Sequence, residues 1–270
     1  MQNICFLFRA SEDFEEEYEI AKETLSFPVY RFRSEIPSNH LVFGRYSVLP
    51  FRKELGEELA LNNSRLVNSY RQHQYIANFD YYEDIKEFTP QTWFQWANLP
   101  EGEYIVKGRT NSRKFQWKHQ MYAPSKNDVT RIVSRLMDDS LVRDQGVVVR
   151  EFVKLRKFMD GMNGLPVTNE WRFFLLKDQI IDYGYYWADE PDCQPYEQPP
   201  VECFDLVNKI SNIVKEKTNF FVVDVGEKEN GEWIVIELNS GEMSGLSLID
   251  PFRFYANFDN SLKHINKELL

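Results

Sequence analysis

Residues 220–245, FFVVDVGEKENGEWIVIELNSGEMSG, constrain the fold more than any other segment of this chain. Two short apolar runs flank a polar turn, which is the pattern of a β-hairpin. The first run carries Asp224, and the second carries Glu237 and Asn239 two positions apart. Because residues two apart in a strand point to the same face, Glu237 and Asn239 project together. Pairing of the two strands can then bring Asp224 beside them.

The chemistry of these three side chains points to a metal. Carboxylate and carboxamide oxygens are hard ligands of the kind that Mg²⁺ takes while it keeps water and substrate phosphates. The two acids lie between apolar neighbours, where a charge without a partner is costly. The alternative is that the three are polar positions facing solvent. The pattern predicts a magnesium site formed by Asp224, Glu237 and Asn239.

The rest of the chain predicts the α+β class, because strand-like and helix-like segments are mixed rather than strictly alternating. Residues 89–102 combine turn signals with a short helix and are a candidate domain boundary. The expected strands are residues 3–9, 27–33, 40–51, 104–109 and 146–153 and two strands around a turn at 177–178, and the expected helices are 11–25, 126–139 and 201–218.

Charge and hydropathy narrow the function. The net charge of −10 argues against a dedicated nucleic-acid binder. Residues 104–157 nevertheless carry thirteen Lys and Arg against five acids, which suggests either a solvated basic face or a site for a small polyanion such as nucleotide phosphates. No apolar run approaches the ~20 residues of a membrane helix. The acidic start is unlike a signal peptide, so a cytoplasmic location is expected.

Lys107 ends an apolar strand, YIVK, where its ammonium group could meet a phosphate. The alternative is a lysine that extends from a strand end into solvent. The polar, basic residues 108–118 follow without periodicity and suit a loop over phosphates, with Lys114 and Lys118 as contacts. Neither a Walker pattern nor a dinucleotide glycine fingerprint is present.

Two further strands carry candidate residues. The strand VVVREFVKL ends in Glu151, Phe152 and Val153, which either belong to a core strand or form a linker that offers backbone groups to an adenine edge. Arg172, in NEWRFF, is a single arginine among apolar residues and needs an anionic partner. That partner is a phosphate or one of the acids above. No histidine, serine or cysteine pattern supports a hydrolytic nucleophile.

In this order, the motifs resemble the ATP-grasp superfamily, in particular its short stand-alone members from bacteria and their phages. The resemblance extends over about residues 89–248. It rests on Lys107, the polar loop, REFV, NEWRFF and the ending Asp224…Glu237-Leu238-Asn239, of which the ending is the most specific element.

The resemblance implies an α+β fold in which two α+β subdomains grip ATP, preceded by an α/β pre-ATP-grasp domain. The implied boundaries are 1–98 for the N-terminal domain and 99–270 for the ATP-grasp domain. Within the latter, a small subdomain spans about 99–152 and a large subdomain about 153–270.

The resemblance also implies roles for the candidate residues. Lys107 would contact the nucleotide phosphates, and Arg172 would reach the phosphates or an acyl-phosphate; both would be catalytic. Residues 240–245 would lie near the acceptor. The implied nucleotide-binding set is Lys107, Lys114, Lys118, Glu151, Phe152, Val153 and Glu170, and the implied ligands of one or two Mg²⁺ are Asp224, Glu237 and Asn239.

The implied activity is an ATP-dependent carboxylate–amine or peptide ligase that forms a C–N bond through an acyl-phosphate and converts ATP to ADP and phosphate. Its partners would be small-molecule or peptide carboxylates and amines. Two alternatives remain at this point: a non-catalytic ATP-binding or regulatory protein on the same fold, and kinase-like transfer to another acceptor.

One departure from the superfamily pattern is clear. The usual member has a second nucleotide-binding lysine upstream of the strand lysine, but residues 69–82, SYRQHQYIANFDYY, contain none. Arg71 or His73 could replace it, or the contact is missing. The covering loop also lacks the common run of glycines.

Overall fold

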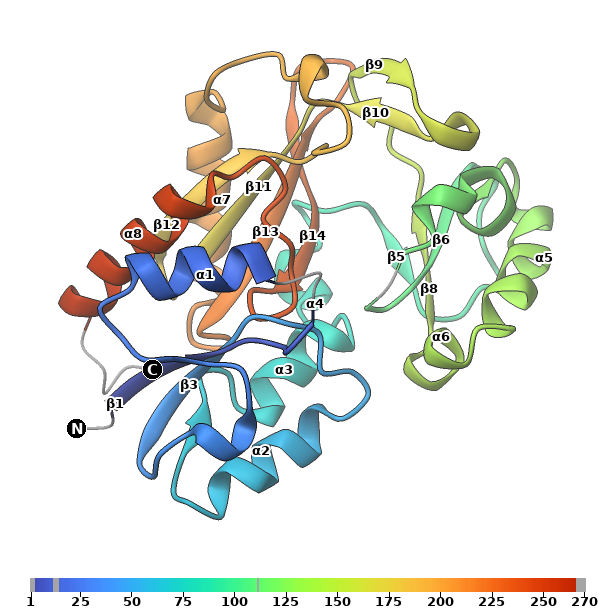
Figure 1. The fold of residues 1–270 in the computed structure, drawn as a ribbon. Coiled ribbons are helices and arrows are strands. Elements are labelled where there is room, and N and C mark those ends of the chain that lie inside the picture. Colours follow the sequence, from blue (N-terminus) through green and yellow to red (C-terminus); the bar gives the residue numbers. More distant parts are fainter. Residues whose placement is uncertain (1–2, 12–14, 111, 266–270) are drawn as a thin grey trace.

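The computed structural model describes residues 3–11, 15–110 and 112–265. The α+β prediction is confirmed, because parallel and antiparallel sheets occur in separate parts of the chain with helices packed on them. Figure 1 shows the N-terminal sheet in blue, a smaller unit in green that stands to one side, and a large sheet in yellow and red between them.

The N-terminal unit is a parallel sheet in the order β2-β1-β3-β4. Alternate residues of β1 point to opposite faces: Phe6 packs in the core with α1, whereas Cys5 and Leu7 pack in the core with α2. The strand expected at 27–33 is only two residues long. The elements are β1 (Asn3–Leu7), α1 (Glu15–Thr24), β2 (Val29–Tyr30), η2 (Arg33–Glu35), β3 (His40–Gly44), α2 (Arg52–Ala60) and β4 (Arg65–Leu66).

The small subdomain is an antiparallel sheet in the order β5-β8-β6-β7. Its main helix, α5, buries Val129, Ile132, Val133 and Leu136, which recur at helical spacing and face the sheet. The short helix expected within 89–102 is absent, and β5 occurs there instead. The elements are β5 (Thr92–Trp93), β6 (Tyr104–Gly108), η3 (Lys114–Gln116), the π-helix η4 (Trp117–Met121), β7 (Tyr122–Ala123), α5 (Lys126–Met137), α6 (Ser140–Gln145) and β8 (Val147–Glu151).

The large subdomain is built on an antiparallel sheet in the order β12-β11-β13-β14, and β13 and β14 form the predicted hairpin. A two-stranded sheet, β9 and β10, lies at its edge toward the small subdomain (Figure 1). The elements are β9 (Lys157–Asp160), η5 (Met162–Gly164), β10 (Pro166–Thr168), β11 (Glu170–Leu176), β12 (Gln179–Tyr185), η6 (Pro191–Cys193), α7 (Val201–Val214), β13 (Phe220–Glu227), β14 (Trp233–Ser240) and α8 (Pro251–His264).

Both faces of the large sheet are covered. On one face, Phe173 and Val223 pack with α7 and with the helices α3 (Tyr70–Ala77) and α4 (Tyr82–Ile85). On the other face, Phe174 and Phe220 share a core with α8 and the N-terminal sheet. Helix α8 lies beside α1, so the last described helix of the chain contacts the first (Figure 1).

This packing bears on the domain boundary expected at residue 98. Helices α3 and α4 bury their apolar faces in the core of the large sheet, and β5 pairs with β8 of the small subdomain. Residues 70–93 therefore already belong to the other two units, before the expected boundary. Among the described residues, no helix has the length and apolar character needed to cross a membrane.

Candidate functional site

Three charged residues form a row across the large sheet. In the strand register, Arg172 of β11 faces Asp224 of β13, and Asp224 faces Glu237 of β14. The pairing of β13 with β14 becomes irregular directly after Asp224, between that residue and Val225. The sheet thus brings residues that are up to 65 positions apart in sequence onto neighbouring strands.

The Arg172 guanidinium forms a bidentate pair with the Asp224 carboxylate. Nε donates to Oδ1 and Nη2 donates to Oδ2, both at 2.8 Å. The Asn239 amide nitrogen donates to the same Oδ2 at 3.0 Å, and Arg172 Nη1 donates to the carbonyl oxygen of Gly245 at 2.9 Å. Only 1% of the Asp224 surface is exposed. Of the two partners open for Arg172, the structure provides the acid.

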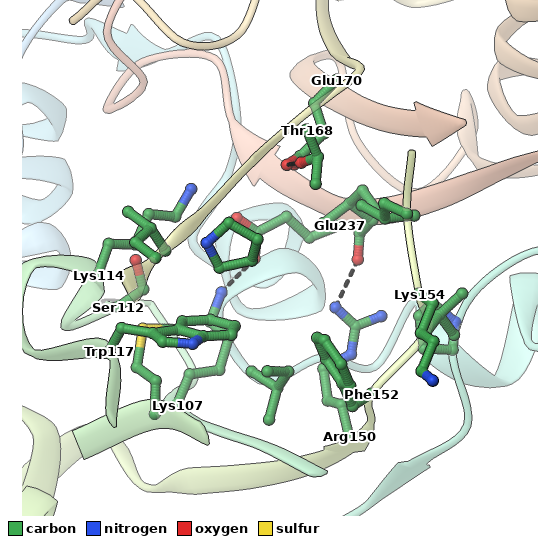
Figure 2. Close-up of a pocket in the computed structure, with 18 of the residues that line it drawn as sticks. Lys107, Ser112, Lys114, Trp117, Arg150, Phe152, Lys154, Thr168, Glu170 and Glu237 are labelled. Atoms are coloured by element: carbon green, nitrogen blue, oxygen red, sulfur yellow. Dashed lines mark hydrogen bonds and ion pairs between the residues drawn. The ribbon is translucent and has the colours of Figure 1, made fainter. Parts of the chain in front are cut away.

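Glu237 has a different kind of partner, because it pairs with Lys107 of β6 in the small subdomain. Figure 2 shows the two side chains pointing toward one another across a cavity. Burial alone would raise the pKa of Glu237, but the charges of Lys107 and Lys114 and the hydrogen bond from Lys107 hold that pKa well below its usual range. Glu237 is therefore ionised at neutral pH.

The cavity between the small and large subdomains has a volume of about 350 Å³. Charged groups gather at one end: Lys107, Lys114, Glu170 and Glu237 all line it (Figure 2). Aromatic and aliphatic side chains line the rest, namely Ile105, Trp117, Met121, Phe152, Leu155, Leu165, Trp187 and Ile236. The cavity therefore has one charged and one apolar end.

The segment Glu151-Phe152-Val153 leads from β8 of the small subdomain toward the large one and lines the cavity. The Phe152 amide donates to the carbonyl of Glu103 at 3.0 Å, and its ring lies edge-on to Trp117. By contrast, the backbone N–H and C=O of Val153 have no hydrogen-bond partner among the described residues. A donor and an acceptor are thus free beside the apolar end of the cavity.

A family model for the ATP-grasp domain, describing the third family of one clade of such domains, matches residues 94–258. The chain belongs to this ATP-grasp family.

Solved structures agree with the family in fold. The chain is similar to D-cycloserine synthetase DcsG (13% identity, TM-score 0.62, covering 96% of this chain and 100% of that one). It is also similar to the ATP-grasp ligase PsnB complexed with a phosphomimetic variant of its minimal precursor, Mg and ADP (12%, 0.57, 97% and 97%). A third is D-alanine–D-alanine ligase from Bacillus anthracis complexed with ATP (12%, 0.58, 97% and 98%). No protein with a curated description matches by sequence.

The ATP-grasp cavity includes most of the residues that the sequence singled out. Lys114 donates to the Tyr186 hydroxyl, and its ammonium lies 3.9 Å from the centre of that ring. Glu170 accepts a hydrogen bond from Thr168, and burial raises its pKa against the opposing charge of Lys114. Lys118 differs: it is exposed, its chain end lies against Gly164, and it does not line the cavity. Its nucleotide contact remains a prediction.

Neither candidate for the absent upstream lysine reaches this cavity. Arg71 is exposed, and His73 is buried beside a second, smaller cavity. Burial and the charge of Arg52 lower the pKa of His73 to about 4, so the imidazole is neutral at pH 7.

The sequence analysis missed Arg150, which lines the cavity and joins the two subdomains. Its Nε and Nη2 donate to the hydroxyls of Thr92 (3.2 Å) and Thr89 (2.7 Å), and its Nη1 donates to the carbonyl of Ile236. A charged residue in the apolar run VVVREF was an available signal, because a buried charge needs partners. The ring of Trp117 and the side chain of Leu165 gave no such signal, since they come from irregular segments.

Proposed function

We propose that this protein is an ATP-dependent ligase that joins a carboxylate to an amine through an acyl-phosphate, with a small molecule or a peptide as substrate. The observation that carries the proposal is the cavity itself. It has lysines and an ionised glutamate at one end and an apolar sleeve with free backbone groups at the other. Membership of the ATP-grasp family supports the same function.

ATP fits the two ends of the cavity in one orientation. The unpaired N–H and C=O of Val153 suit the polar edge of adenine, and the rings of Trp117 and Phe152 suit its faces. The indole N–H of Trp187 is buried without a partner in the same cavity, which leaves a donor for the nucleotide. Glu151 and Glu170 would contact the nucleoside. The phosphates would then lie at Lys107 and Lys114.

The predicted magnesium ligands fit Mg²⁺ in chemistry, since two carboxylates and a carboxamide lie at adjacent positions of β13 and β14. No group of three or more His, Cys, Asp or Glu side chains within the described ranges is placed to hold a metal, so the Asn239 amide oxygen is needed as the third donor. In this structure Lys107 supplies the positive charge beside Glu237. Bound Mg²⁺ would withdraw charge from the transferring phosphoryl group.

In the proposed reaction, a substrate carboxylate oxygen attacks the γ-phosphorus and the bond from this phosphorus to the β-phosphate oxygen breaks, which releases ADP. An amine then attacks the acyl carbon, so that the C–N bond forms and phosphate leaves. Lys107 stabilises the developing negative charge by moving from Glu237 to the phosphates. Arg172 has five N–H donors, and three are used by Asp224 and Gly245, which leaves two for the acyl-phosphate.

A second candidate is a protein that binds ATP without catalysis. Two observations favour it. Both carboxylates of the hairpin are already neutralised by basic side chains, and no upstream lysine, Arg71 or His73 lines the nucleotide cavity.

The deciding experiment has two parts. Thermal unfolding with and without Mg-ATP is measured for the native chain, for Glu237→Ala and for Glu232→Ala, an exposed acid on the turn of the same hairpin. Ligand at a hundredfold excess over Kd stabilises the folded state by ~2.7 kcal/mol. We expect this shift in the native chain and the control, and its loss in Glu237→Ala.

The second part separates the two candidates. Hydroxylamine converts an acyl-phosphate to a hydroxamate, so carboxylate-dependent release of ADP together with hydroxamate identifies the ligase. A nucleotide-induced shift with no turnover for any carboxylate supports the binding protein instead. Absence of any shift with nucleotide refutes both.

A further inference from the structure

A second cavity, of about 130 Å³, lies where the three units of the fold meet. The N-terminal unit provides the loop after β3, helix α3 provides His73, and β6 of the small subdomain continues into Arg109 and Thr110. The large subdomain provides the end of β14, with Asn239 and Ser240, and the loop that follows.

Four polar atoms on the wall of this cavity are buried without a hydrogen-bond partner. They are His73 Nδ1, Arg109 Nε, Thr110 Oγ1 and Ser240 Oγ. The His73 side chain belongs to a residue only 4% exposed. Buried polar atoms in folded proteins nearly always have partners, so four unpaired ones around one small space indicate a missing polar ligand.

The charge of the cavity indicates an anion. Arg109 forms no ion pair with any described residue, and its nearest aromatic neighbour is Phe94, 5.5 Å from the guanidinium. His73 is neutral at pH 7 because burial and the charge of Arg52 lower its pKa to about 4. Glu242, the acid of the adjoining loop, is already paired with Arg52 at 3.2 Å. An unpaired guanidinium with hydroxyl donors matches a carboxylate.

The cavity is adjacent to the charged end of the nucleotide cavity. Lys107 and Glu237 line the nucleotide cavity, and the residues two positions further on, Arg109 and Asn239, line the second one. Two residues advance a strand by roughly 7 Å. A group held at Arg109 therefore lies next to the place proposed for the terminal phosphate.

The loop that closes the cavity is fixed in place. The Arg45 guanidinium donates to the carbonyl of Gly241 at 2.6 Å, and Arg52 pairs with Glu242, which also accepts from the Asn68 amide at 3.3 Å. All three partners come from the N-terminal unit. The wall is thus formed before any ligand binds, as is usual for small-molecule sites.

We propose that this cavity binds the acceptor as a small free carboxylic acid, of the size of a small amino acid or hydroxy acid, with its carboxylate at Arg109, Thr110 and Ser240. The inference rests on the proposed function and names the substrate class of that site. The carboxylate held there is the one whose oxygen attacks the γ-phosphorus, with loss of ADP. The limited volume excludes a folded protein tail or a long peptide side chain.

The test uses the full chain and a panel of free acids: glycine, the two alanine enantiomers, the two serine enantiomers and lactate, with tri-alanine as the peptide comparison. Carboxylate-dependent ADP release and hydroxamate formation are measured for the native chain, Arg109→Gln, Ala77→Leu and Arg143→Gln. Ala77→Leu fills the cavity with an apolar side chain, and Arg143→Gln removes an exposed arginine elsewhere. Affinity for Mg-ATP is measured separately for every variant.

We expect at least one small acid to support turnover, and Arg109→Gln to raise its KM by about tenfold to a hundredfold, the effect of losing a charged hydrogen bond. Ala77→Leu should raise the KM as well, while Arg143→Gln and all affinities for Mg-ATP stay unchanged. Turnover with tri-alanine only, or an unchanged KM in Arg109→Gln and Ala77→Leu, overturns the inference and leaves the ligase standing.

If Mg-ATP does not bind, the proposed function fails, and the cavity is judged by thermal unfolding alone. In that case stabilisation by a small acid in the native chain and in Arg143→Gln, but not in Arg109→Gln, supports the carboxylate site. No stabilisation of the native chain by any acid of the panel overturns it.

Discussion

Two ion pairs of this protein have the same components but different settings. Arg172 and Asp224 lie on neighbouring strands of one sheet, and two hydrogen bonds of 2.8 Å join them. Lys107 and Glu237 lie on different subdomains, and their pair borders the cavity. The first pair is held by the sheet that contains it. The second depends on the relative position of two units.

The difference shows which pair can change with ligand. A planar guanidinium that binds a carboxylate with two hydrogen bonds is fixed in orientation, whereas an ammonium on a flexible stem can exchange one anion for another. Arg172 and Asn239 therefore hold Asp224 in place, and Lys107 is free to move from Glu237 to a phosphate. Four predictions break or sharpen this contrast.

The largest effect is expected for Arg172→Met. The substitution leaves the Asp224 carboxylate buried without its charged partner, which costs about 3–5 kcal/mol of unfolding free energy. Urea denaturation measures it. The double variant Arg172→Met with Asp224→Leu should recover most of this loss, because no charge is then left buried. A single variant as stable as the native chain would show that the sheet does not depend on the pair.

Lys107→Met should act mainly on catalysis. Its loss leaves Glu237 beside a cavity that water can enter, so the cost in stability is smaller than for Arg172→Met. Turnover should fall by about 10²–10³-fold, the cost of removing a group that stabilises transition-state charge. Steady-state kinetics with Mg-ATP and an acceptor measures it, with Lys86→Met, an exposed lysine, as control. Turnover reduced no more than in the control contradicts the role of Lys107.

Acid separates the pairs from His73. The pKa of His73 is lowered to about 4 in the folded state, so below its unfolded value of about 6.5 the unfolded chain takes up a proton that the folded chain does not. Stability contributed by neutral His73 is therefore complete above pH 6.5 and falls by about 2 kcal/mol between pH 6.5 and 5.

The pH dependence of unfolding of the native chain, His73→Gln and Glu237→Gln tests this. The His73 variant should lack the loss between pH 6.5 and 5, and the Glu237 variant should keep it. Because the pKa of Glu237 is lowered in the folded state, its contribution is present above the unfolded pKa and is lost only at more acidic pH. Parallel curves for the native chain and His73→Gln down to pH 5 would contradict the assignment.

The smallest effect concerns the two lysines of the covering segment. Lys114 lines the cavity, whereas Lys118 is exposed outside it. Lys114→Met should weaken Mg-ATP binding by about tenfold, as expected for one charged hydrogen bond. Lys118→Met should change the affinity by much less. Calorimetric titration of both variants decides, and equal losses would show that the segment closes over the phosphates when ATP binds.

Prediction from sequence was most successful where local patterns are strong. The α5 helix and the β13–β14 hairpin were predicted within a few residues, because their apolar spacing follows helix and strand periods. The short helix expected within 89–102 was wrong. There Thr92 and Trp93 form an edge strand against β8, a pairing that depends on residues more than fifty positions away.

The sequence by itself determined the chemistry of this protein: which side chains carry charge, which strands hold them, and the ATP-grasp order of motifs. Only the tertiary structure decided the partners. It paired Arg172 with Asp224, placed Lys107 against Glu237 and left Lys118 outside the cavity. It also assembled the second cavity around His73 and Arg109, from three units. The reason is physical: an ionic partner is chosen by distance in space, and a linear pattern does not contain that distance.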